Sequence, residues 1–299
     1  MTRIIYSLYI DIPEDELDWQ PPFHGEEEPK TFKTKRLMKE YADWLKSMHI
    51  QYAEACGIEY RLYEYDSDYI EYKKMFNEKY PMITSYNIVN FYKIHLMYEL
   101  AKEFDEILYL DFDVVPLSNR NFFDHWNLSK GISILTNRRL IDTTLHRLVV
   151  EKHNVEKFGK KISNRSPTAK YWNARAMLLE SNMSGANDVY NTGIVGVTSK
   201  HLEQLDYWGD FESILNMMTE LRYDEFSMWP THIQEIFGWD NETIWSYKMS
   251  MNNLDKQWLS EDWHHFMDKW SYIPEGTNFV HVINKEFSYV KDWYEKNRL

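Results

Sequence analysis

One short segment constrains the fold more than any other part of the chain. Residues 106–117 read Glu-Ile-Leu-Tyr-Leu-Asp-Phe-Asp-Val-Val-Pro-Leu, an apolar run interrupted by two carboxylates, Asp111 and Asp113. An apolar run with a sharp polar end is typical of an interior strand of a parallel sheet. Because strand side chains alternate between faces, we expect Asp111 and Asp113 to point the same way at the carboxyl end of this strand.

Two unpaired carboxylates in that position would repel each other and lose hydration. A divalent cation is the simplest compensation, and hard oxygen ligands suit Mg²⁺ or Mn²⁺, which share their coordination shell with phosphate oxygens. A solvated strand end would show the same two residues, so the rest of the chain must decide between the two interpretations.

The pattern of the chain predicts an α/β fold with a parallel sheet. Strands are expected at 3–12, 58–65 and 106–117, alternating with helices at 34–56 and 85–104. Further strands are expected at 132–136, 191–198 and 278–283, with helices from Ser199, over 224–237 and over 287–296. Residues 140–187 have an irregular, partly helical pattern, and we expect an insertion there.

Composition narrows the function classes. A net charge of −13 disfavours an open nucleic-acid-binding surface, which needs clustered Lys and Arg. The single cysteine, Cys56, cannot form an internal disulfide, which favours a reducing, cytoplasmic location. The first apolar run is too short for a signal peptide, and no run approaches the ~20 apolar residues that span a bilayer. Peripheral membrane contact stays compatible with the sequence.

The Asp-x-Asp that follows Tyr109-Leu110 resembles the metal motif of GT-A glycosyltransferases, in particular the retaining family that includes glycogenin and the bacterial lipopolysaccharide galactosyltransferases. The resemblance implies a Rossmann-like, mostly parallel sheet flanked by helices. It further implies one large domain over residues 1–299 with a C-terminal elaboration. The nucleotide-sugar half would cover about 1–136, and the acceptor side with the closing elements about 137–299.

Two more segments carry the resemblance and imply site residues. Tyr190-Asn191-Thr192-Gly193 resembles the family's Phe-Asn-Ala-Gly, in which Asn191 would meet sugar hydroxyls. Residues 278–286 resemble the family's His-x-x-Gly-x-x-Lys-Pro-Trp, although the Gly is missing and the Lys comes two positions early. The resemblance implies that His281 joins Asp111 and Asp113 as a metal ligand and that Lys285 meets the diphosphate.

An acidic pair, Asp224 and Glu225, matches the place where the family has an acidic or amide pair at a helix start beside the donor sugar. One of the two would stabilise an oxocarbenium-like transition state by charge or by covalent attack. Asp224 would equally suit a helix N-cap. Donor contacts are implied for the following residues: Tyr9, Asp11, Lys93, Asp111, Phe112 and Lys285.

Together these motifs predict a metal-dependent glycosyltransferase of the hexosyltransferase type. The implied donor is a nucleotide-diphosphate sugar, a UDP-sugar first among the choices, and the resemblance implies retention. A glycan or glycosylated acceptor is expected, and nucleic acid is not. The alternatives are a nucleotidyltransferase, a sugar-nucleotide hydrolase, or a glycan-binding protein without turnover.

The segment from Lys160 to Arg175 mixes basic residues with Tyr171 and Trp172. Aromatic faces stack on sugar rings, so this segment is a candidate acceptor surface, and a solvated loop is the alternative. Duplex DNA with modified bases is the outlying acceptor that a basic cluster leaves open. The adjacent His264 and His265 would point in different directions on a regular element, so we do not expect a zinc site there.

Overall fold

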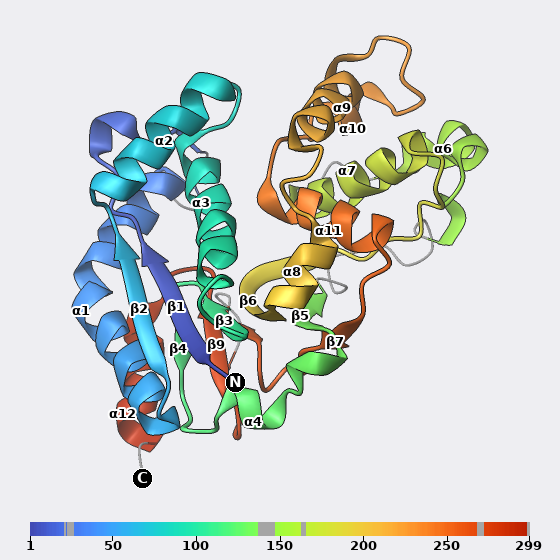
Figure 1. Ribbon diagram of the computed structural model, residues 1–299. Coiled ribbons are helices and arrows are strands. Elements are labelled where there is room, and N and C mark those ends of the chain that lie inside the picture. The colour runs from blue at the N-terminus through green and yellow to red at the C-terminus, as the bar shows by residue number, and fades with distance from the viewer. Residues whose placement is uncertain (21, 23–26, 137–146, 163–165, 268–271, 298–299) are drawn as a thin grey trace. The chain divides into compact units, whose positions relative to one another are not determined.

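The computed structural model describes residues 1–20, 22, 27–136, 147–162, 166–267 and 272–297 (Figure 1). The chain divides into two compact units. Unit 1 contains Met1–Leu135, Thr192–Ser199 and Lys256–Leu299, and unit 2 contains Thr136–Asn191 and Lys200–Asp255. The single domain over 1–299 stays a prediction.

The main sheet has six strands in the order β2-β1-β3-β6-β5-β7. Their bounds are β1 Arg3–Tyr9, β2 Glu59–Glu64, β3 Glu106–Leu110, β5 Ile132–Thr136, β6 Tyr190–Thr198 and β7 Lys256–Trp258. The pairs β1–β2, β1–β3 and β5–β7 are parallel, and β3–β6 is antiparallel. The predicted α/β class with a mostly parallel sheet is therefore confirmed.

Helices cover both faces of the strands of unit 1. These helices are α1 Lys30–Cys56, α2 Ser67–Lys79, α3 Ser85–Leu100 and α12 Phe287–Asn297, with the short α4 Phe122–His125. On β1, Ile5 joins a core cluster with Tyr52 of α1, whereas the hydroxyl of the next residue, Tyr6, donates to the Lys93 carbonyl of α3 at 2.7 Å. This alternation places α1 and α3 against opposite faces of β1.

The ends of these helices follow from local residue chemistry. Gly57 ends α1 in the left-handed conformation, at φ 66°, which glycine adopts without steric cost. Thr84 caps α3 by accepting the Asn87 N–H at 3.3 Å, and Asp66 caps α2 in the same way. The predicted helices at 34–56 and 85–104 are present, while α2 was not predicted.

A second, three-stranded sheet in unit 1 corrects the prediction for 106–117. The strand β3 ends at Leu110, residues 111–113 form a turn, and β4 Val114–Pro116 belongs to the order β4-β9-β8. Here β9 is Phe279–Val282 and β8 is His265–Met267. Asp111 and Asp113 thus lie in a turn between two sheets, and strand alternation does not explain their common direction.

Unit 2 consists mainly of helices. These are α6 Lys152–Phe158, α7 Ser166–Glu180, α8 Ser199–Leu205, α9 Phe211–Tyr223, α10 Thr231–Gln234 and α11 Asn241–Met251. Contacts of α7 with α11 and α9 build its interior, where Trp172 and Trp229 lie with ring centroids 6.0 Å apart. No helix in the described part of the chain has both the length and the apolar character to span a bilayer.

The predicted helix over 224–237 is wrong. Asp224 is the C-cap of α9, residues 224–229 form turns and bends, and only α10 is helical in this range. The physical reason is Pro230, which disfavours helical backbone at Trp229 and cannot donate an N–H. Asp224 is therefore not the N-cap that the sequence suggested.

Candidate functional site

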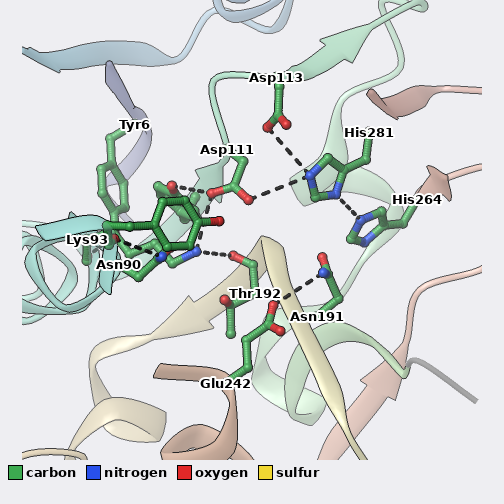
Figure 2. A network of polar contacts seen from close by, with 12 residues as sticks. Tyr6, Asn90, Lys93, Asp111, Asp113, Asn191, Thr192, Glu242, His264 and His281 are labelled. Atoms are coloured by element: carbon green, nitrogen blue, oxygen red, sulfur yellow. Dashed lines mark hydrogen bonds and ion pairs between the residues drawn. The ribbon is translucent and has the colours of Figure 1, made fainter. Parts of the chain in front are cut away.

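Three side chains in unit 1 converge on one point. Ligand atoms of Asp111, Asp113 and His281 all lie within 4.8 Å of one another. The His281 Nε2 is 3.7 Å from Asp111 Oδ2 and 3.5 Å from Asp113 Oδ1 (Figure 2). The structure therefore brings together the three residues that the sequence predicted as metal ligands.

Backbone pairing explains why residues so far apart in sequence meet. The Asp111 N–H donates to the Gly193 carbonyl of β6 at 2.7 Å, and the Val114 N–H closes the turn on the Asp111 carbonyl at 2.9 Å. The strand β4 then pairs antiparallel with β9, with Val114 opposite His281. The turn between β3 and β4 and the register of β9 together set the geometry of the three ligands.

Both carboxylates already have cationic partners. The buried Lys93 Nζ lies 3.3 Å from Asp111 Oδ1 and 3.2 Å from the Thr192 carbonyl. The Lys285 Nζ contacts Asp113 Oδ2, and the Tyr109 hydroxyl donates to Asp111 Oδ1 at 2.5 Å. The sequence-based premise of two unpaired, repelling carboxylates is therefore wrong.

The electrostatics of Asp113 and Lys285 reflect this pairing. Burial alone would raise the pKa of Asp113, but Lys285 and then His281 outweigh it and hold the pKa well below its ordinary value. Burial would lower the pKa of Lys285, but Asp113 outweighs it and the net shift is upward. Each residue stabilises the charged form of the other.

A second histidine supports His281. The His264 Nε2 lies 3.0 Å from His281 Nδ1, and both rings are buried (Figure 2). Burial and then the neighbouring His281 lower the pKa of His264 well below its ordinary value, so this ring is neutral. For His281 to present a lone pair at Nε2, its proton must sit on Nδ1 and be donated to His264.

Sequence reasoning missed His264 because it judged the two adjacent histidines as a possible zinc site only. The useful signal was the placement of Trp263-His-His-Phe266 just before β9. The parallel pairing of β8 with β9 sets His265 opposite Val280 and Phe266 opposite His281. His264 immediately precedes β8 and thus comes within reach of the His281 ring.

The carboxyl ends of β1 and β3 meet at the same edge of the sheet, where ligands of open α/β sheets bind. There Tyr9 stacks on Phe112 with ring centroids 4.8 Å apart. Asp11 pairs with Lys35 of α1. The predicted donor-contact residues Tyr9, Phe112, Asp111 and Lys93 thus lie at or beside this edge, and their role in binding stays a prediction.

In unit 2, Asn191 contacts an acidic residue that the sequence analysis did not single out. The Asn191 Nδ2 donates to Glu242 Oε1 at 3.2 Å (Figure 2). The Lys170 Nζ lies 2.5 Å from Glu242 Oε2. Glu242 is buried in the first turn of α11, whose N-cap Asp240 accepts the Thr243 N–H at 2.9 Å. The capping sequence Asp-Asn-Glu before an apolar run was the available signal.

Asp224 and Glu225 have a different environment. Both are exposed, and Asp224 Oδ1 accepts the Phe226 N–H at 2.9 Å in a local turn. They do not start a helix, so the helix-start context of the resemblance is absent. Their catalytic role, like that of Asn191, stays a prediction.

The aromatic surface predicted between Lys160 and Arg175 is wrong in its central part. Tyr171, Trp172 and Arg175 are buried, and Trp172 is only 2% exposed. They lie on α7, where the Arg175 guanidinium contacts the Tyr171 hydroxyl and the Val149 carbonyl. Burial lowers the pKa of Arg175 to about 10. Neither aromatic ring is available to a sugar, while Lys160 and Lys161 are exposed and Arg165 lies outside the described residues.

The donor set at Asp111, Asp113 and His281 fits a divalent cation. Carboxylate oxygens and a neutral imidazole nitrogen suit Mn²⁺, and carboxylates with phosphate oxygens suit Mg²⁺. The contact between His281 Nδ1 and His264 Nε2 fits this assignment, because metal-bound histidines are commonly held by such a second contact. Within the part of the chain that the structure describes, these three residues form the candidate cation site.

No family model matches the chain, and no curated protein matches it. Among solved structures, it is similar to a glycosyltransferase involved in glycosylation of the major capsid of PBCV-1, at 12% identity and a TM-score of 0.43, covering 99% of this chain and 100% of that one. Mouse xyloside xylosyltransferase 1 gives 10% identity and a TM-score of 0.43, covering 95% and 98%. The galactosyltransferase LgtC gives 10% identity and a TM-score of 0.38, covering 94% of this chain and 87% of that one.

Proposed function

We propose that this protein is a metal-dependent glycosyltransferase that uses a nucleotide-diphosphate sugar. One observation carries the proposal: Asp111, Asp113 and His281 converge at the end of β3, with Lys93 and Lys285 beside them. Carboxylates, an imidazole and two ammonium groups in one place suit a cation together with a diphosphate. The three sequence segments that resemble family motifs, at Asp111–Asp113, at Tyr190–Gly193 and at 278–286, support the same assignment.

The residues of the chain would divide the work as follows. Asp111, Asp113 and His281 would hold Mn²⁺ or Mg²⁺, which would neutralise charge developing on the departing diphosphate. Lys285 would donate hydrogen bonds to the same diphosphate. The stacked Tyr9 and Phe112 offer an aromatic surface for the nucleotide base at the shared edge of β1 and β3.

The finer features are proposals from the resemblance. They are retention of configuration, a UDP-sugar as donor, a hydroxyl on a glycan as acceptor, and roles for Asn191, Asp224 and Glu225 near the transferred sugar. Glu242 becomes a further candidate, because it is a buried carboxylate bonded to Asn191. For the three carboxylate candidates, Asp224, Glu225 and Glu242, an Asn or Gln substitution removes the charge and keeps the shape of the side chain.

A screen of nucleotide sugars tests the proposal. A donor present at a hundred times its dissociation constant stabilises the folded protein by about 2.7 kcal/mol, which a thermal-shift assay detects, with and without Mn²⁺. The hit is then incubated with glycan acceptors and the products are identified. Metal-dependent release of nucleoside diphosphate with transfer to an acceptor is expected. Release of pyrophosphate would indicate a nucleotidyltransferase, and release without an acceptor a hydrolase.

The matched variants are Asp113→Asn and Asp292→Asn. Asp113 is buried in the site, whereas Asp292 is an exposed residue of α12. We expect transfer to be lost in the first and unchanged in the second. Full transfer by Asp113→Asn, or by the wild type in excess chelator, would rule out the metal-dependent mechanism.

A further inference from the structure

The two lysines of the site balance its two carboxylates. Lys93 pairs with Asp111, and Lys285 pairs with Asp113. All four are part of one cluster in unit 1, in which the side chains of Lys93 and Lys285 are 4% and 13% exposed. The carboxylates therefore do not need a cation for charge balance.

We infer that Lys285 and Lys93 are resident counter-ions that make a divalent cation and a diphosphate bind as a coupled pair. The inference rests on the proposed function and adds an order of events at the site. Lys285 would leave Asp113 when the cation arrives and would bind the diphosphate instead. Lys93 would stay, because the Thr192 carbonyl also accepts from its Nζ at 3.2 Å.

The coupling arises because binding of the cation alone costs free energy, and binding of the diphosphate offsets that cost. A cation that takes Asp113 must displace Lys285, which leaves a partly buried ammonium group unpaired and adds two positive charges to a balanced cluster. A diphosphate offsets these charges and accepts the hydrogen bonds of the released ammonium. By linkage, each ligand then raises the affinity of the other by the same factor.

The backbone at Lys285 supports a functional position for this side chain. Lys285 has φ 63°, a left-handed conformation that a lysine rarely adopts. Its N–H donates to the Val282 carbonyl at 3.1 Å, and its own carbonyl accepts the Phe287 N–H at 2.8 Å, so the turn into α12 fixes it there. The sequence thus keeps a lysine where a glycine would be less strained.

Calorimetric titration of the full chain tests the coupling without knowledge of the donor. The titrants are Mn²⁺ alone, pyrophosphate alone and the preformed Mn²⁺–pyrophosphate complex, which carries the diphosphate without a base. For the wild type, we expect the complex to bind at least about tenfold more tightly than either component, a coupling of about 1.4 kcal/mol.

Three variants distinguish the effect of a positive charge at position 285 from the effect of the net charge of the protein. Lys285→Met removes the ammonium group from Asp113, Lys285→Arg keeps a cation there, and Lys296→Met removes an exposed cation from α12, the helix that follows Lys285. In Lys285→Met we expect Mn²⁺ alone to bind about tenfold more tightly than in the wild type, because the Asp113 carboxylate is no longer paired with Lys285. The coupling between Mn²⁺ and pyrophosphate should disappear. Lys285→Arg and Lys296→Met should retain the coupling.

The outcomes distinguish this inference from the proposed function. The counter-ion role would be overturned if Mn²⁺ alone bound with the same affinity to the wild type and to Lys285→Met, and if pyrophosphate did not change that affinity. Binding of the Mn²⁺–pyrophosphate complex would still support a metal and diphosphate site. Absence of any binding of the complex would overturn both. Because the coupling is first measured on the wild type, a Lys285→Met protein that failed to fold would leave the test intact.

Discussion

Two acidic pairs in this chain were candidate site residues from the sequence, and the structure gives them opposite environments. Asp111 and Asp113 each contact a lysine and face His281, and Asp113 is buried. Asp224 and Glu225 are exposed in a turn after α9, where Asp224 accepts one local N–H. A carboxylate pair becomes a candidate site when neighbouring elements supply polar partners that hold its side chains in place. The first pair has such partners, and the second pair lacks them.

The strongest test of this contrast is Asp113→Asn. Besides losing transfer, this variant should lose roughly 3 kcal/mol of stability, because the partly buried Lys285 ammonium is left without a carboxylate. Urea unfolding measures the change. The double variant Asp113→Asn/Lys285→Met should recover most of the loss, and an additive loss in the double variant would contradict the ion-pair explanation.

Acid should destabilise the buried region beside the site through His49. This residue is fully buried on α1, with Ser7 Oγ 2.9 Å from Nδ1 and the Val114 carbonyl 2.7 Å from Nε2. Burial lowers its pKa from 6.5 to about 4. Between pH 6.5 and about 4, His49 is therefore protonated in the unfolded chain and neutral in the folded chain. The free energy of unfolding falls as the pH falls through this range.

The expected loss from His49 is roughly 2–3 kcal/mol at pH 4 relative to pH 7. Urea unfolding at both values measures it, and His49→Gln should remove most of the slope between pH 6.5 and 4. An unchanged slope in that variant would show that other groups dominate the acid response.

A smaller effect is expected from His264→Phe. The phenyl ring keeps the packing against Phe266 and His281 but cannot accept the His281 Nδ1–H. We expect the Mn²⁺–pyrophosphate complex to bind about tenfold more weakly, with His281 shifted toward the Nε2–H tautomer in nitrogen NMR spectra. His265→Gln, one residue further along, is the control. Unchanged affinity and tautomer in His264→Phe would make His264 a packing residue only.

The smallest stability effects belong to the exposed pair. Asp224→Asn and Glu225→Gln should each change the free energy of unfolding by less than about 0.5 kcal/mol, because neither side chain is buried. Any loss of turnover in these variants would then report on chemistry rather than folding. Wild-type turnover in both would remove the pair from the reaction, and Glu242→Gln would become the next variant to assay.

Sequence patterns predicted those features that depend on local chemistry. The strand at 132–136 has the predicted bounds. The grouping of Asp111, Asp113 and His281 was implied by the resemblance to a known metal motif and not by local pattern. Long-range pairing was not accessible: nothing local to 106–117 indicated that β4 would leave the main sheet to pair with β9. For the same reason the carboxylate partners of Lys93 and Lys285 could not be assigned, whereas His264 had a sequence signal that was overlooked.

Errors in unit 2 have equally specific causes. The helix predicted over 224–237 ignored Pro230, and the acceptor surface assumed that mixed basic and aromatic residues lie in a loop. Instead, Tyr171, Trp172 and Arg175 fall on the inward face of α7. Aromatic side chains on the inward face of a helix bury apolar area and are not free to bind a ligand.

The interleaving of the two units bears on how the chain reaches its native state. Unit 2 is encoded in two pieces that flank the stretch Thr192–Ser199, which belongs to unit 1 and pairs with β3. Neither unit is a contiguous fragment, and Asp113 and Lys285 are 172 residues apart. On a ribosome, the centre can therefore assemble only after almost the whole of this sequence has emerged, and such non-local pairing makes folding slow. Truncated or nicked chains would then lack the site altogether rather than retain a weakened form of it.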